Sequence, residues 1–200
     1  KVIFSSNINI NDLYKDGLQR EQFIPFLKIL ENNCYEKELL IKEDYRASSS
    51  INLERFLSPI DKSSNFIFNK FFRKITKNKN KTSKILEIKG RNIVLENFYE
   101  KVVKFEFEEL CNRNLGSEDY LKIAENCEFI FIKNLPDFNE NNSDQQQRFI
   151  TLIDIIYEKK IPLMILSQVN LDLIKSSRSM IEPFKRTVSR LYELTSMNYN

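Results

Sequence analysis

The sequence contains no histidine in its 200 residues. A Ser-His-Asp or Cys-His catalytic arrangement, and any site that relies on imidazole ligands, therefore cannot be built from this chain alone. The side chains that remain for chemistry are carboxylates, arginines and asparagines.

Glycine is nearly as scarce, and Gly17, Gly90 and Gly116 are its only three positions. None of them belongs to a G-x-x-x-x-G-K-S/T loop, whose backbone N–H groups cradle the phosphates of a nucleotide. The chain therefore carries no P-loop of its own.

Cysteines and long apolar runs are also limited. Cys34, Cys111 and Cys127 are odd in number, lie far apart and show no C-x-x-C spacing. This pattern favours reduced, buried thiols over disulfides or a zinc site. No apolar run approaches the length of a membrane span, and no charged-then-apolar leader opens the sequence.

The composition that is present can build a core, since 42% of the residues are hydrophobic and 30% are charged. A net charge of +3 is too small to indicate a nucleic-acid partner by itself. One dense basic stretch favours a solvated loop over a surface that follows phosphates, because no aromatic residues for base stacking are interleaved. It comprises Lys74, Lys77, Lys79, Lys81 and Lys84.

The first residues predict a short buried strand, Val2-Ile3-Phe4, that leads into Ser5-Ser6-Asn7. An asparagine at the end of a strand, followed by an arginine on the next helix, is how phosphate-handling α/β proteins direct polar groups at a nucleotide. Asn7 and Arg20 occupy these two positions. Because no cap or turn precedes the strand, we expect the chain to begin inside a domain.

The first part of the chain predicts alternating helices and strands. Apolar spacing indicates a helix around Leu18 to Asn32, in which Pro25 should introduce a kink or a restart, and then a strand near Glu36 to Ile41. A second helix, rich in phenylalanine and lysine, is expected from Phe66 to Ile75.

The pattern becomes β between about residues 83 and 107. Two strands, Lys84 to Ile88 and Asn92 to Glu96, flank Gly90, and Val102 to Phe105 supplies a third. We interpret Gly90 as the residue that gives the turn its positive φ, in preference to an anion site.

The last part returns to α/β order. Ser117 and Ser143 are predicted helix caps, and Phe129 to Ile132 and Leu163 to Leu166 are predicted buried strands. The final strand and its Arg-bearing helix weakly repeat the order of the opening segment, so a degenerate internal repeat is one interpretation and coincidence is the other.

Five dispersed segments occur in the order found in one family. Together they resemble the ZapE family of AAA+ ATPases, whose eukaryotic relatives are mitochondrial AFG-type ATPases, in the part that follows the second acidic motif. The resemblance covers nearly the whole chain. The segments are Ser5-Ser6-Asn7 followed by Asp12 to Arg20 with Phe23-Ile24-Pro25, then Phe105 to Cys111, Leu115 to Tyr120, Arg148 to Asp154, and Phe184 to Leu191.

This resemblance implies an α/β fold and a division of the chain. Residues 1–62 would be the carboxyl-terminal part of a P-loop AAA+ ATPase core, arranged as strand, helix and strand. Residues 63–82 would form a lid helix and basic loop. Residues 83–200 would hold a small β-hairpin insertion and a further α/β segment that ends in a sensor-type helix.

The resemblance also implies roles for four residues. Asn7 matches the sensor asparagine, and Arg20 is the leading candidate for an arginine finger that acts on a neighbouring subunit. Gln22 stands where many relatives carry a second basic residue, which is the alternative finger position. Arg186 and Arg190, one helical turn apart, would be nucleotide-contacting sensor residues.

Further implications concern ligands and partners. ATP and Mg²⁺ would be bound mainly by an amino-terminal part absent from this chain, and the sequence offers no metal site of its own because Lys133-Asn134 stands where relatives often have acidic residues. The family implies self-association into a ring, remodelling of a protein such as a division or membrane-associated protein, and a bacterial cytoplasmic or mitochondrial location. This chain alone would not hydrolyse ATP. The alternative is a non-catalytic α/β module that binds a protein or, through the basic loop, nucleic acid.

Overall fold

The computed structural model describes residues 6, 8–15, 17–35, 37 and 55–197. The chain divides into two compact units, Lys1–Asp44 and Tyr45–Asn200, and each is treated by itself. Asn7, the predicted strand Val2-Ile3-Phe4 and most of the predicted strand near Glu36 to Ile41 lie outside the described residues.

The described part of unit 1 contains a short 3-10 helix, Ile10–Asp12, and the helix α1, Arg20–Asn33. The predicted helix is confirmed, although Pro25 neither ends it nor restarts it. Proline removes one backbone hydrogen bond from the helix, to the carbonyl four residues earlier at Glu21, and the helix continues beyond it. The turn before α1 holds Gln19 in the left-handed region, at φ 60°.

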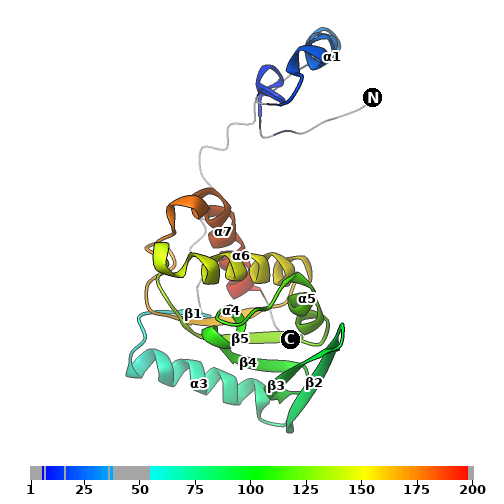
Figure 1. The fold of residues 1–200 in the computed structure, drawn as a ribbon. Coiled ribbons are helices and arrows are strands. Elements are labelled where there is room, and N and C mark those ends of the chain that lie inside the picture. The colour runs from blue at the N-terminus through cyan, green and yellow to red at the C-terminus, as the bar shows by residue number, and fades with distance from the viewer. Residues whose placement is uncertain (1–5, 7, 16, 36, 38–54, 198–200) are drawn as a thin grey trace. The chain divides into compact units, whose positions relative to one another are not determined.

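Unit 2 is built on a six-stranded sheet in the order β1-β6-β5-β4-β3-β2, shown in Figure 1. Strands β1, β6, β5 and β4 are mutually parallel, whereas β4, β3 and β2 form an antiparallel meander. Their bounds are β1 Phe56–Leu57, β2 Lys81–Ile88, β3 Arg91–Tyr99, β4 Val102–Glu106, β5 Phe129–Leu135 and β6 Leu163–Ser167.

Helices cover both faces of this sheet. One face carries α3, Lys62–Thr76, and the other carries the remaining helices of unit 2 (Figure 1). These are α4 Phe107–Cys111, α5 Ser117–Glu125, α6 Ser143–Glu158 and α7 Ile181–Ser196. The prediction of an α/β fold is thereby confirmed.

Strand β5 shows how the sequence produces these layers. Side chains alternate across a strand, so Phe129 and Phe131 join the apolar cluster beneath α3, while Ile130 and Ile132 join the cluster beneath α5, α6 and α7. A strand buried on both faces is a continuous apolar run, which is typical of the centre of a parallel sheet. The four predicted strands from residue 84 to residue 132 and the one at 163–166 are confirmed.

The helix caps correct two predictions. Ser117 and Ser143 are the first residues of α5 and α6, not their caps, which are Gly116 and Asn142. At α5 the carboxylate of Asp119 accepts a hydrogen bond from the Gly116 N–H at 2.8 Å. The acidic residue of the first turn thus replaces the serine that sequence reasoning favoured.

The β2–β3 turn agrees with its prediction, since Lys89 and Gly90 both adopt positive φ, at 46° and 81°. The hairpin joins the main sheet, where Phe98 and Tyr99 pair with Val103 and Val102 of β4. The division of the chain at residues 62 and 82 and the role of α3 as a lid stay predictions. In the described part, no helix is long and apolar enough to span a bilayer.

Candidate functional site

Arg20 is the first residue of α1, and the backbone before the helix fixes its side chain. Its two terminal nitrogens donate to the carbonyls of Asn11 at 2.8 Å and Lys15 at 3.2 Å. A guanidinium has five N–H groups, so these two bonds leave donors free for another oxygen. Arg20 is partly exposed, not sealed in a core.

The loop that receives Arg20 has its own charged pair. Lys15 Nζ lies 2.8 Å from Asp12 Oδ1. This hydrogen bond, and then the Lys15 charge, hold the pKa of the Asp12 carboxyl below its usual value, and the charge of Arg20 lowers it further. The loop therefore presents two cations around one carboxylate.

Gly17 allows the backbone of this loop to lie against the ring of Tyr14. A Cβ at position 17 would lie 2.2 Å from an atom of the Tyr14 ring, so the ring occupies the space that a side chain would fill. The same ring lies 5.4 Å from that of Phe23, centroid to centroid. The loop is thus packed onto the helix that begins with Arg20. Gln22, at the alternative position for the arginine finger, is exposed.

The two predicted sensor arginines differ in their surroundings, although both lie on α7. Arg186 is exposed, and its side chain makes no hydrogen bond or ion pair with the residues that the structure describes. Arg190 forms an ion pair with Asp154 of α6, and its guanidinium carbon lies 4.9 Å from the centre of the Tyr157 ring. Arg190 therefore fastens α7 to α6.

Glu193 of α7 contacts the same tyrosine as Arg190. It accepts a hydrogen bond from the Tyr157 hydroxyl at 2.7 Å. Tyr157 thus receives the Arg190 charge on its ring and donates to Glu193 through its hydroxyl. These contacts fix the rotation of α7 against α6.

Arg55 is a functional candidate that the sequence did not suggest. Its buried guanidinium donates to the last carbonyls of α7, at 2.9 Å to Thr195 and 3.5 Å to Leu194, and also to Met197. A cation at a helix C-terminus satisfies carbonyls that have no partner within the helix. No motif surrounds Arg55, so only tertiary structure could identify it as the residue that holds the end of α7.

The carboxyl ends of β4 and β5 carry polar residues next to each other. Glu106 is in register with Lys133, and Asn134 Nδ2 donates to Glu106 Oε2 at 2.7 Å. Within the described ranges, no three His, Cys, Asp or Glu side chains are placed to hold a metal ion. This edge of the sheet offers an amide bound to a carboxylate, with the cationic residue Lys133 in register with that carboxylate.

The predicted site residues belong to different parts of the chain. Arg186 and Arg190 share α7 in unit 2, whereas Arg20 belongs to unit 1 and Asn7 lies outside the described residues. Partly exposed guanidinium groups suit one chemistry best, the binding of carboxylate or phosphate oxygens.

Comparison with known proteins gives a match along the entire chain. A family model described as AFG1-like ATPase matches residues 1–200. Lactation elevated protein 1 homolog B of Danio rerio is 28% identical over 234 residues, covering 99% of this chain and 46% of the relative. Cell division protein ZapE of Escherichia coli K12 is 25% identical over 198 residues, covering 99% of this chain and 53% of the relative.

A third relative, an uncharacterized protein of Schizosaccharomyces pombe, is 30% identical over 170 residues, covering 84% of this chain and 37% of the relative. No solved structure matches the chain. The chain spans about half the length of the first two curated relatives, 46% and 53%.

Proposed function

The chain belongs to the AFG1-like ATPase family, and we propose that it is the carboxyl-terminal part of an AAA+ ATPase that couples ATP hydrolysis to remodelling of a protein partner. The observation that carries this proposal is the family match over residues 1–200. The absence of a phosphate-cradling loop from the same residues supports a division of labour, in which the P-loop belongs to another part of the protein.

Arg20 is proposed to be the arginine finger. Hydrolysis of ATP develops negative charge on the γ-phosphate oxygens, and a guanidinium from a neighbouring subunit can stabilise this charge. In the best-studied GTPases such an arginine lowers the activation barrier of hydrolysis by about 4 to 7 kcal/mol. The carbonyls of Asn11 and Lys15 hold the Arg20 guanidinium while leaving some of its N–H groups unused. Such anchoring reduces the entropy lost when the group meets phosphate.

Arg186 is proposed to contact nucleotide phosphate, with Arg190 and Arg55 as positioning residues. Arg186 is exposed on α7, whereas Arg190 is already paired with Asp154 and Arg55 with the carbonyls at the end of the helix. In this arrangement Arg190 sets the rotation of α7 and Arg55 sets its end. Asn7 keeps the role of sensor asparagine that the resemblance gave it.

The described residues fit the phosphate groups of ATP but not the Mg²⁺ ion. Arg20 and Arg186 suit phosphate oxygens, since both present guanidinium N–H groups at partly or fully exposed positions. Mg²⁺ needs several oxygen ligands, and the described residues provide no acidic cluster for it. We therefore assign no step of hydrolysis to a metal held by this chain.

The output and the assembly are proposed from the relatives. The E. coli relative is named a cell division protein, and the partner that we propose for the ATPase is a division or membrane-associated protein. A finger that acts between subunits requires self-association, and a ring supplies every pocket with a neighbour. Relatives occur in a bacterium, a fission yeast and a fish, and we propose a cytoplasmic location in bacteria or a mitochondrial one in eukaryotes.

Mixed assemblies of the full-length protein test the finger. We expect Arg20→Ala to lower kcat for ATP by about a thousandfold or more, with the KM much less affected. A second variant, disabled in the nucleotide-binding half but with Arg20 intact, should also be inactive. Mixing the two should restore part of the turnover, because some pockets then combine an intact P-loop with an intact neighbouring Arg20.

Control variants separate these roles from general damage. Arg73→Ala removes an exposed arginine of α3, whose Nε donates to the Asn69 carbonyl of the same helix, and should leave turnover unchanged. Arg186→Ala should weaken ATP binding about tenfold or more. Failure of the mixture to regain activity would refute a trans-acting Arg20. Robust Arg20-dependent hydrolysis by residues 1–200 alone would refute the proposed division of labour.

A further inference from the structure

Strands β3 and β4 separate soon after the turn that joins them. They pair only through Phe98 with Val103 and Tyr99 with Val102. Beyond those pairs β3 continues to Arg91 alongside β2, while β4 continues to Glu106 alongside β5. Two neighbouring strands of one sheet therefore diverge and leave a wedge between them.

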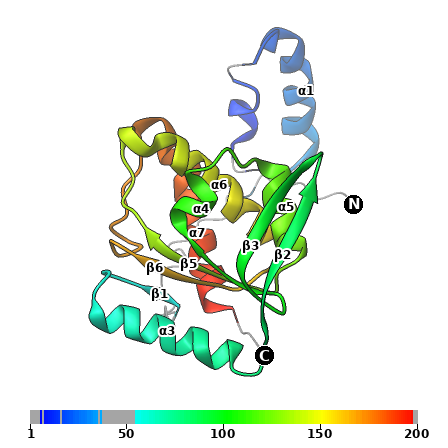
Figure 2. The ribbon, with the colours of Figure 1, turned by 60° about the horizontal axis from the view of Figure 1, so that its bottom comes forward.

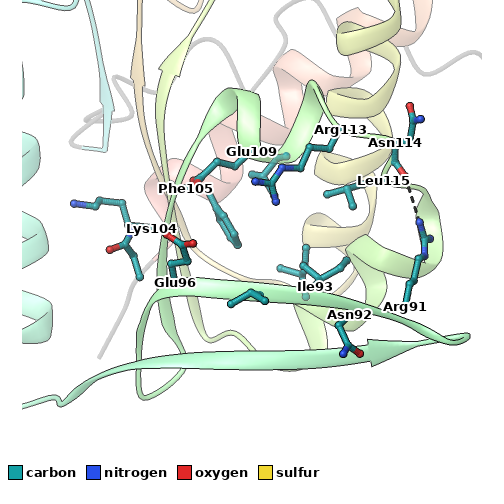
Figure 3. Close-up of a pocket in the computed structure, with 14 residues that line it drawn as sticks. Arg91, Asn92, Ile93, Glu96, Lys104, Phe105, Glu109, Arg113, Asn114 and Leu115 are labelled. Atoms are coloured by element: carbon teal, nitrogen blue, oxygen red, sulfur yellow. Dashed lines mark hydrogen bonds between the residues drawn. The ribbon is translucent and has the colours of Figure 1, made fainter.

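A cavity of about 460 Å³ fills this wedge, which we call the β3–β4 cleft. Its apolar lining includes Ile93 of β3, Phe105 of β4 and Leu115 between α4 and α5, which Figure 3 shows. Leu110 of α4 and Ile123 of α5 also line it. The volume falls within the range of ligand-binding clefts in proteins. The cleft is large enough for several peptide residues and has an apolar floor.

Ion pairs at the far end hold the hairpin away from β4. Arg91 donates to both carboxylate oxygens of Asp119, at 2.7 and 2.6 Å, and to the Asn114 carbonyl at 3.3 Å. Asp119 is 0% exposed and also accepts from the Gly116 N–H. The hairpin is thus fixed at its tip to α5 and to the segment that precedes α5, and at its base to β4, so the wedge cannot close simply by strand pairing (Figures 2 and 3).

The strand edges that face the cleft carry backbone groups without a strand partner. Residues of an antiparallel pair alternate between hydrogen-bonding to each other and pointing outward. Arg91 pairs with Ile88 across the two-residue turn, so Asn92 and Val94 direct their N–H and C=O groups away from β2 and toward the cleft.

The edge of β4 has the matching orientation. The N–H of Glu106 leaves the sheet and donates to Glu109 Oε2 at 2.8 Å. Lys104 lies two residues earlier, so its backbone groups point the same way. These edges are the template on which an extended peptide adds as a further strand.

One charged group of the lining suggests what the peptide carries. Arg113, in the segment after α4, extends over the cleft beside Glu109 (Figure 3). Its side chain is exposed and forms no hydrogen bond or ion pair with the residues that the structure describes. By contrast Arg91 is paired with Asp119, and Glu109 holds the Glu106 N–H. Arg113 is therefore suited to a carboxylate from outside.

We propose that the β3–β4 cleft binds an extended, acidic segment of a partner protein, which adds as a strand to the edge of β3 and places a carboxylate against Arg113. Apolar side chains at alternate positions of that segment would enter the floor around Phe105 and Leu115. This inference does not depend on ATP hydrolysis, so it stands or falls separately from the function proposed above.

The test uses a fluorescent ten-residue peptide that alternates valine with aspartate, with fluorescence anisotropy on the whole chain as the measurement. Two matched probes accompany it. One replaces each aspartate with lysine, and the other carries N-methyl groups on alternate amides and cannot form strand hydrogen bonds. We expect the acidic probe to bind at least about tenfold more tightly than either of the other two.

Two pairs of variants locate the binding. Val94→Pro removes an N–H that faces the cleft, while Ile85→Pro removes one from its cross-strand partner on the outer edge of β2. Only Val94→Pro should weaken binding of the acidic probe, by about tenfold or more. Thermal unfolding confirms that both variants fold. Arg113→Glu should reverse the preference between the acidic and basic probes, and the exposed control Arg73→Glu should not.

Three results would overturn the proposal. The first is equal binding of the N-methylated and unmodified probes, which would mean that no strand is added. The second is no binding of the acidic probe to the unaltered chain. The third is a self-associated chain whose oligomers dissociate with Arg113→Glu, because the cleft would then hold a second copy. If either proline variant unfolds, the Arg113→Glu reversal and the N-methylated probe still decide the matter.

Discussion

Unit 1 and unit 2 solve the problem of burying apolar side chains to very different extents. Among the described residues of unit 1, Leu27 of α1 is buried, whereas Leu18, Phe26, Ile29 and Tyr35 are all exposed. Unit 2 buries two apolar clusters, one on each face of its sheet. Unit 1 therefore leaves several large apolar side chains exposed, whereas unit 2 buries most of its large apolar side chains.

This difference indicates where the stability of the chain resides. An isolated helix shorter than about 12 to 15 residues is marginal in water, and most helical stability in proteins comes from packing one apolar face. The α1 helix, with 14 residues, has that face without a described surface to cover it. We therefore expect unit 2 to fold through its own contacts and unit 1 to gain order when its exposed apolar side chains are covered.

The largest expected effect comes from a core truncation in unit 2. Phe131→Ala removes a ring that is 0% exposed and that contacts the rings of Phe68, Phe71, Phe72 and Phe129. Burial and the resulting cavity predict a loss of about 3 to 5 kcal/mol in the free energy of unfolding. Urea unfolding followed by circular dichroism measures it.

The matched change in unit 1 sharpens this comparison. Phe26 is 47% exposed, and Phe26→Ala should alter the same unfolding transition by less than about 0.5 kcal/mol. Equal effects of the two truncations would mean that unit 1 contributes to the cooperative core as strongly as unit 2.

Thiol labelling gives the next largest contrast. Cys34 is exposed, against the expectation of three buried thiols, while Cys111 and Cys127 are buried. Burial raises the pKa of Cys127 to about 12 and raises that of Cys111 as well, so little thiolate forms in unit 2 at neutral pH. An aromatic disulfide reagent should label Cys34 at least about a hundredfold faster, because the others require unit 2 to open.

Two controls complete the labelling experiment. Cys34→Ser should remove the rapid phase and leave the slow one, and denaturant should expose all remaining thiols. Rapid reaction of two or more thiols in the folded chain would contradict the closed core of unit 2.

The smallest effect concerns a helix cap and pH. Asp61 accepts hydrogen bonds from the N–H and the hydroxyl of Ser64, and these bonds hold its pKa below the ordinary 3.8. A lowered pKa means that the ionised cap stabilises the fold above about pH 3.8 and that this contribution disappears as pH falls through the folded-state value. Asp61→Asn should therefore lower the thermal midpoint slightly at pH 7 and less at pH 3.

A matched variant tests whether the effect belongs to the cap. Asp144 lies in the first turn of α6, where the structure records no side-chain cap bond. Asp144→Asn should show a weaker difference between the two pH values. A pH-independent effect of Asp61→Asn would show that the charge of Asp61 contributes nothing.

Local sequence patterns predicted most strands and helices of unit 2, whereas tertiary contacts decided its helix caps and the separation of β3 from β4. Buried strands such as Phe129 to Ile132 and the turn at Gly90 have signals within a few residues, so they could be read from the sequence. The caps at Gly116 and Asn142 could not, because Ser117 and Ser143 are equally good cap residues and neighbouring groups decide which is used. The separation of β3 from β4 depends on Arg91 and Asp119, which lie 28 residues apart.

The candidate site was less accessible to sequence reasoning. The resemblance singled out Arg20, Arg186 and Arg190 because they lie in motifs, and no local signal gave Arg186 and Arg190 different roles. Their difference depends on Asp154 and Tyr157 of another helix. Arg55 lies in no motif. Its partners are backbone carbonyls far along the chain, such as that of Thr195, which is 140 positions away. Such contacts leave no pattern in side-chain chemistry along the chain.

The contacts of Arg55 have a mechanical consequence. They place the beginning of the described part of unit 2 directly against its end, because Arg55 immediately precedes β1 and its partners terminate α7. A tension applied through the backbone on both sides would load the Arg55 guanidinium and its carbonyl acceptors together with the edge of the sheet, because the Arg55 carbonyl accepts a hydrogen bond from the Ile165 N–H of β6 at 2.7 Å.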